Sequence, residues 1–161
     1  MAGDAAPAAA APELVGIGGW LVLVAIGQVL GPIRVLLSLG NYYVNELDSS
    51  LFETFPATVY GEVVLNVAFF AFSVFVAIMF FRHSWLFPRL YILQWILIAA
   101  LPLIDAGWVA VTASAYSGES LSEYLTMDPK DIGQVIGAVI IGPIWIAYIL
   151  RSRRVKNTFV K

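Results

Sequence analysis

The feature that most constrains the fold is an apolar run from Gly16 to Leu39, in which Arg34 is the only charged residue. A helix rises about 1.5 Å per residue and a bilayer crossing needs about 20 apolar residues, so this run of 24 residues predicts a transmembrane helix. An arginine at the centre of such a helix costs about 2.5–3.5 kcal/mol on insertion scales. We therefore expect Arg34 to meet a polar or charged partner elsewhere in the chain.

Three more apolar segments of comparable length follow, at about residues 60–81, 90–112 and 132–150. The whole chain is 60% hydrophobic and 12% charged, whereas soluble domains are about half apolar and a quarter charged. This composition disfavours the alternative of a soluble protein with buried core helices. The sequence predicts an all-α membrane protein, a four-transmembrane-helix bundle spanning residues 14–150.

Lysine and arginine are distributed unevenly between the segments that connect these spans. Residues 82–89 form a short basic turn and residues 151–161 form a basic tail. The acidic loops at 40–59 and 113–131 contain only one lysine or arginine, Lys130. By the positive-inside rule, both termini are expected in the cytoplasm and the two acidic loops outside. Residues 1–13 are rich in alanine and proline and lack a basic signal-peptide start, so we expect a retained, disordered cytoplasmic tail.

Each predicted span carries a polar group that helical rise places in the outer half of the bilayer. The predicted buried polar cluster consists of Arg34, Glu62, Asn66, Asp105 and Gln134. In a functional interpretation, Arg34 pairs with Asp105 and Glu62 is left as a proton or cation site, because ionisable residues inside membranes are functional candidates. In a structural interpretation, the same pair only pins the first helix to the third, and Glu62 reaches the outer surface.

Glycine and proline recur in similar patterns in the first and fourth spans. The predicted packing residues are Gly27, Gly31, Pro32, Gly133, Gly137, Gly142 and Pro143. Glycines four residues apart allow close helix approach, so we expect these two helices to pack on each other or to form an oligomer face. The alternative is that both residue types are simply common in membrane helices.

The basic tail has two interpretations of its own. Its cations are Arg151, Arg153, Arg154 and Lys156, together with Lys161. They can anchor the end of the last helix at anionic lipid headgroups, or they can dock a specific lipid or protein.

Several kinds of chemistry are excluded or left without residues. The chain has no cysteine, which excludes disulfides, thiolate nucleophiles and iron–sulfur clusters. It has one histidine, His83, in the basic turn, so a site held by several histidines cannot form. No serine-protease or paired-aspartate arrangement is present in the spans. We expect no enzyme activity, no cofactor, no metal site and no nucleic-acid partner.

Distinctive residues lie at the two ends of the predicted bundle. They are Gly16-Ile17-Gly18-Gly19-Trp20-Leu21 at the start, and Ile144-Trp145-Ile146-Ala147-Tyr148 followed by the 152–160 segment at the end. In these residues and in its four-helix layout, the chain resembles the bacterial family of small inner-membrane proteins catalogued as domain of unknown function 2569. The resemblance implies a multi-pass protein of the bacterial inner membrane and brings no established activity or site residues.

The function expected from the sequence is that of a non-enzymatic accessory or interaction protein. Its partner would be the lipid bilayer together with another membrane protein or a second copy of itself. The alternative is a small transporter or channel that uses the outer polar cluster of Arg34, Glu62 and Asp105. A receptor-like role in lipid binding is a third possibility.

Overall fold

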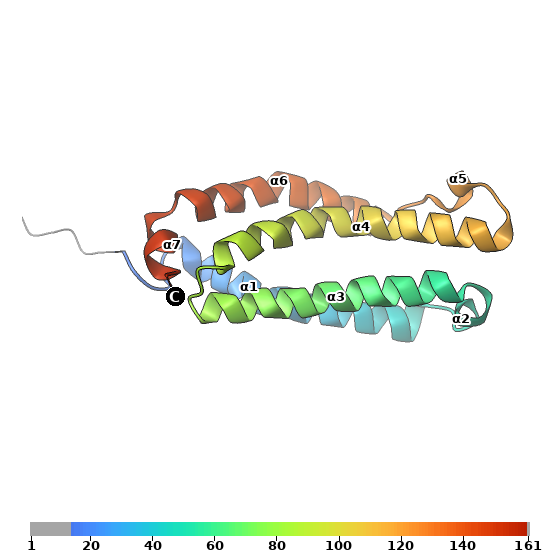
Figure 1. Ribbon diagram of the computed structural model, residues 1–161, viewed down its shortest axis with the longest axis horizontal. Helices are drawn as coiled ribbons and strands as arrows, with labels where there is room; N and C mark the ends of the chain where they lie inside the picture. Colours follow the sequence, from blue (N-terminus) through green and yellow to red (C-terminus); the bar gives the residue numbers. More distant parts are fainter. Residues whose placement is uncertain (1–13, 161) are drawn as a thin grey trace, which may run out of the picture.

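The computed structural model describes residues 14–160 as a bundle of four long helices joined by short connections (Figure 1). The long helices are α1 (Trp20–Asn41), α3 (Pro56–Phe81), α4 (Phe87–Ser117) and α6 (Pro129–Arg151). Within the described residues there is no strand, and each long helix is long and apolar enough to cross a membrane. The prediction of an all-helical chain with four helices able to span a membrane is confirmed.

The helices begin and end at different residues than the apolar runs suggested. α1 begins at Trp20 instead of Gly16, because Gly19 has a φ of 56° that a helix cannot contain. The same helix continues past the predicted end as the π-helix η1 (Tyr42–Glu46), and the short helix α2 (Leu51–Thr54) lies within the predicted loop. α4 extends to Ser117, and α5 (Leu121–Tyr124) follows it. The predicted tail at residues 1–13 lies outside the described residues.

The long helices pack in the order of the chain. α1 packs on α3, α3 on α4, and α4 on α6. α1 and α6 do not pack along their lengths, although they approach near their ends. Trp20 meets Trp145 with ring centroids 6.3 Å apart, and at the opposite end Lys130 Nζ donates to Ser38 Oγ at 3.5 Å. The fourth side of the bundle is therefore a seam between α1 and α6.

The prediction that the first and fourth helices pack through their glycines is wrong for the single chain. A Cβ placed on Gly27, Gly31, Gly133 or Gly137 would meet no atom within 4 Å. These glycines let α1 and α6 present open surface, and the sequential helix pairs supply the packing instead. The other expectation, that they form an oligomer face, stays a prediction.

The end of the bundle that carries the basic 151–160 segment has a continuous apolar core, which we call the basic-end core. Its buried residues are Leu21, Val24, Val76, Phe80, Phe87, Tyr91, Ile149, Val155 and Phe159. Phe159 follows the short helix α7 (Arg153–Thr158), and its ring stacks on Phe87 with centroids 4.6 Å apart. The described part of the predicted tail, residues 151–160, is thus no free tail, because α7 folds back beneath the bundle.

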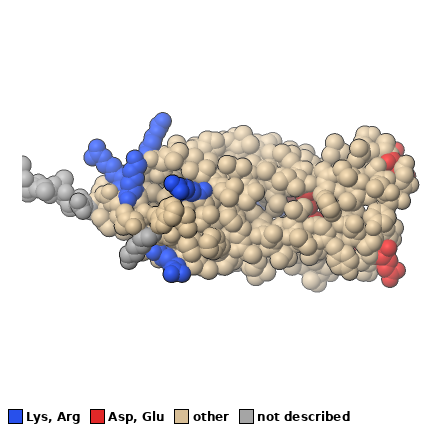
Figure 2. All heavy atoms as spheres, viewed as in Figure 1, with Lys and Arg blue, Asp and Glu red and all other residues tan. Residues whose placement is uncertain are grey.

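The two distinctive ends of the chain meet beside this core. The backbone N–H of Gly16 donates to Thr158 Oγ1 at 2.9 Å, and the Arg154 side chain lies against Gly18. Arg151, Arg153 and Lys156 stay exposed around them. Figure 2 shows Lys and Arg gathered at the end that carries α7, and Asp and Glu toward the other end. We call these the basic end and the acidic end.

Candidate functional site: a polar pocket in the acidic half

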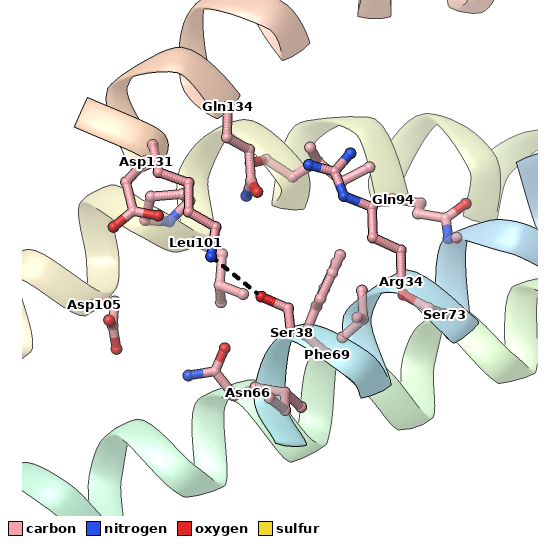
Figure 3. A pocket seen from close by; sticks show the side chains of 16 residues that line it. Arg34, Ser38, Asn66, Phe69, Ser73, Gln94, Leu101, Asp105, Asp131 and Gln134 are labelled. Carbon is pink, nitrogen blue, oxygen red and sulfur yellow. Dashed lines mark hydrogen bonds between the residues drawn. The ribbon is translucent and has the colours of Figure 1, made fainter. Parts of the chain in front are cut away.

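A polar cavity of about 290 Å³ lies among the four long helices in the acidic half (Figure 3). Its lining combines charged, amide and hydroxyl side chains with aliphatic ones. The polar lining residues are Arg34, Ser38, Asn66, Ser73, Gln94, Asp105, Lys130, Asp131 and Gln134. A water molecule occupies about 30 Å³ in the liquid, so the cavity has room for about ten waters or for one small polar group.

The exposure of these residues shows where the cavity opens. Most polar side chains supplied by α1 and α6 are exposed, namely Arg34, Ser38, Lys130 and Gln134, whereas Asp131 is half-buried. Those supplied by α3 and α4 are half-buried or buried; Ser73 and Gln94 are only 2% and 7% exposed. α3 and α4 therefore form the inner wall, and the cavity opens sideways through the seam between α1 and α6.

The pocket carries charges of both signs, set apart from one another. Figure 3 shows Arg34 on the side of Gln94, and Asp105 and Asp131 toward the opposite side. Lys130, beside Asp131 in sequence, reaches Ser38 Oγ. Among residues 14–160, no carboxylate oxygen lies within the 4.0 Å of a lysine or arginine nitrogen that defines an ion pair. The pocket thus offers two cations and two carboxylates that do not neutralise one another by direct contact.

The predicted ion pair between Arg34 and Asp105 is wrong, and the register of the helices explains why. Gln28 Nε2 donates to Gln94 Oε1 at 3.0 Å, which fixes these two residues at one level of the bundle. Arg34 lies six residues beyond Gln28, and Asp105 lies eleven beyond Gln94. At about 1.5 Å per residue, Asp105 sits about 7 Å nearer the acidic end than Arg34.

The remaining predicted polar residues separate into two groups. Asn66 and Gln134 line the pocket, as expected for a cluster, and Gln134 Nε2 donates to the Ile98 carbonyl at 3.4 Å. Glu62 is not among the lining residues. Its Oε2 accepts from the Tyr42 hydroxyl at 3.5 Å, and its carbonyl accepts from Asn66 at 3.0 Å. Four of the five predicted residues therefore line one pocket, with Glu62 held beside it by Tyr42. The prediction that the cluster is buried is wrong for Arg34 and Gln134, whose side chains are exposed where the pocket opens.

The predicted cluster did not include the layer that closes the pocket toward the basic end. Gln28 and Gln94 are both buried, and their side chains bond to each other across α1 and α4. An amide inside an apolar span is the signal that could have identified them, because such groups find partners on neighbouring helices. Ser38, Lys130 and Asp131 were also left out of the predicted cluster, because Ser38 lies at the end of the first predicted span and the other two were assigned to the acidic loop.

Of the predicted packing residues, Gly142 makes a close contact, but with α4 instead of α1. A Cβ on Gly142 would come within 3.1 Å of the Trp95 ring. A second close approach was not predicted: a Cβ on Gly61 would overlap the ring of Trp108, whose Nε1 donates to the Thr58 carbonyl at 3.3 Å. Both contacts hold α4 against a neighbouring helix and leave α1 and α6 apart.

A family model for proteins of unknown function (DUF2569) matches residues 14–160, which is nearly the whole chain. The chain belongs to this family. Comparison with curated proteins and with solved structures gives no match. Family membership agrees with the resemblance found at the two ends of the sequence, which the structure brings together at the basic end. It supplies no activity, and the pocket has to be interpreted from its own chemistry.

Proposed function

We propose that the chain is a non-enzymatic accessory protein of the bacterial inner membrane that holds a membrane-borne partner molecule at the seam between α1 and α6. The observation that carries the proposal is the sideways opening of a charged pocket at that seam. Polar groups inside a membrane protein face partners or functional cavities, because exposure to lipid is costly. A partner that enters from the membrane would cover these groups.

The proposed orientation places the basic end in the cytoplasm. The supporting observation is that the six cations of the described tail and turn lie at one end of the helices: Arg82, Arg89, Arg151, Arg153, Arg154 and Lys156. Positively charged segments remain preferentially in the cytoplasm. In this orientation the pocket lies in the outer half of the membrane, and the exposed arginines beside α7 lie at the inner headgroups.

The alternative of a small transporter or channel receives less support. A conducting path would have to continue from the pocket to the basic end. Toward the basic end, the pocket is closed first by the Gln28–Gln94 bond and then by the basic-end core. The largest side chains of this core, Phe80 and Phe87, are fully buried. Transport would require this core to open, whereas retention of a partner at the seam requires no such rearrangement.

A photo-crosslinking experiment tests the proposal in native membranes. Because the chain lacks cysteine, Ser38→Cys at the seam and Val64→Cys on the exposed surface of α3 each give a single attachment point for a photoreactive group. We expect a discrete adduct from position 38 and only diffuse labelling from position 64.

A blocking pair serves as the control. A Trp at Gly31 fills the pocket, whereas a Trp at Gly27, one turn away, does not line it. Gly31→Trp should abolish the adduct at position 38 and Gly27→Trp should leave it. Equal labelling at positions 38 and 64, or an adduct indifferent to Gly31→Trp, would contradict the proposal.

A further inference from the structure

Resting on the proposed function, we infer that the pocket binds the headgroup of a phospholipid that carries both a phosphate and a primary amine, as phosphatidylethanolamine does. Arg34 and Lys130 would hold the phosphate, and Asp105 with Asp131 would hold the ammonium. The lipid tails would stay outside, in the membrane beside α1 and α6. The inference combines the charge pattern, size, depth and opening of one cavity.

The charge pattern favours a ligand that itself has two separated charges. Guanidinium and ammonium groups bind phosphate through charge-assisted hydrogen bonds, and carboxylates accept such bonds from an ammonium. Arg34 lies on the side of Gln94, and Asp105 and Asp131 lie toward the opposite side. Lys130, which is next to Asp131 in sequence, donates to Ser38 Oγ, and among residues 14–160 no direct ion pair joins these charges. Asp105 Oδ1 is buried and has no hydrogen-bond partner among residues 14–160, so it can accept from a ligand.

The cavity volume matches a headgroup and not a whole lipid. Sites for drug-sized ligands measure about 300–1,000 Å³, and this cavity of about 290 Å³ lies at their lower limit. The rest of an amphiphile would have to lie outside the cavity. The surface beside the opening suits acyl chains, because Leu30 and Leu37 share the face of Arg34 and are 57% and 68% exposed.

The depth of the pocket also fits the position of a lipid phosphate. Measured from Trp20 at about 1.5 Å per residue, Ser38 lies about 27 Å along α1 and Arg34 about 21 Å. The hydrocarbon core is about 30 Å thick, so Ser38 and its neighbour Lys130 lie near the far headgroup layer. Arg34 lies a further turn inward, where an arginine in the membrane favours an anionic partner.

The test measures which lipid stays with the intact chain. The chain is purified into mixed vesicles containing equal phosphatidylethanolamine, phosphatidylglycerol and phosphatidylcholine, extracted gently, and its retained lipids are measured by native mass spectrometry. We expect phosphatidylethanolamine to be retained about tenfold over both others, the factor that one charge-assisted hydrogen bond supplies. Phosphatidylglycerol lacks the ammonium, and the quaternary amine of phosphatidylcholine has no N–H to donate.

Two variants assign the contacts. Arg34→Gln should lower retention of all three lipids about tenfold, whereas Asp105→Asn should lower phosphatidylethanolamine alone and abolish the preference. Lys156→Gln at the basic end is the matched control and should leave the preference unchanged. Folding of each variant is checked by its helical circular dichroism and its elution from gel filtration.

Several results would overturn the inference. Equal retention of the three lipids would do so, as would a preference that survives both Arg34→Gln and Asp105→Asn in folded protein. Displacement of the lipid by water-soluble phosphoethanolamine at a comparable concentration would show that the ligand is a free solute. If the adduct at position 38 proves to be a protein while lipid retention is equal, the lipid inference fails and the proposed accessory function stands.

Discussion

The two halves of the bundle are formed by the same four apolar helices, yet they enclose different interiors. In the basic half, aromatic side chains from α3, α4 and the segment after α7 fill the space between the helices. In the acidic half, the helices surround a cavity of about 290 Å³ lined with charges and amides. The bond between Gln28 and Gln94 marks the boundary between these halves.

The difference shows how a small bundle can combine a stable fold with an accessible site. The basic half contains the interactions that bring the two ends of the chain together, including the bond from Gly16 to Thr158. In the acidic half α1 and α6 stay apart, and the exposed side chains along the seam between them stay accessible from the membrane. Stability is expected to reside mainly in one half and binding in the other.

The largest expected effect comes from the core of the basic half. Phe87→Ala removes a fully buried ring and should lower the free energy of unfolding by about 3–5 kcal/mol. Phe69→Ala, in the wall of the pocket, should cost clearly less, because that ring already borders a cavity. Denaturant unfolding of the purified protein in detergent, followed by circular dichroism, measures both. Equal losses would remove the energetic distinction between the halves.

The next effect compares two glycines that differ in their surroundings. Gly61→Ala places a methyl group into the ring of Trp108 and should destabilise the α3–α4 contact by about 1–3 kcal/mol, as overpacking does. At Gly27 an added Cβ would meet no atom of the described neighbouring segments within 4 Å, so Gly27→Ala should not lower monomer stability, and the helix preference of alanine favours a gain of up to about 1 kcal/mol. The same unfolding assay measures both variants. A loss at position 27 as large as that at position 61 would indicate that α1 packs where the structure leaves it open.

A smaller effect is expected at the boundary between the halves. Gln94→Leu removes one partner of the bond with Gln28, and interhelical bonds in membranes contribute about 0.6 kcal/mol on average. The double variant Gln28→Leu with Gln94→Leu leaves no unpaired amide and should be more stable than Gln94→Leu alone. Additive losses in the unfolding assay would show that the two amides do not act as a pair.

The smallest expected effect concerns Arg34 and Asp105, which form no ion pair. In a double-mutant cycle of Arg34→Gln and Asp105→Asn, the coupling free energy should stay within about 0.5 kcal/mol, as for independent sites. Membrane accumulation of Asp105→Asn should equal that of Glu62→Gln. Immunoblots of membrane fractions and unfolding in detergent provide the two measurements. A coupling well above this limit would restore the ion pair that the sequence suggested.

The sequence predicted the four spans because length and apolar composition determine whether a segment crosses a membrane. The predicted first and last residues of the spans were less accurate, because a helix continues through polar residues as long as its backbone hydrogen bonds continue. α4, for example, runs to Ser117 and ends at Gly118, which has a φ of 77°. The folded tail was missed because its cations dominate the composition, although Val155 and Phe159 are one helical turn apart and both buried.

The candidate site was predicted in part for similar reasons. Polar residues within apolar spans indicated Arg34, Asn66, Asp105 and Gln134 correctly as neighbours of one pocket. Their pairing could not be predicted, because depths counted from helix ends ignore how far one helix is shifted against another. Here the bond between Gln28 and Gln94 marks that shift, and Asp105 lies nearer the acidic end than Arg34, with which it forms no ion pair.

The most direct test of the account asks whether water reaches the acidic half and not the basic half. Asn66→Cys in the pocket wall and Val76→Cys in the basic-end core place single thiols on the same helix, in a chain without other cysteines. The thiolate is the form of cysteine that attacks a thiol reagent, and it forms only where water or polar groups stabilise it. We predict rapid labelling of position 66 by a water-soluble thiol reagent and protection of position 76. Protection of both positions, or equal labelling, would contradict the account.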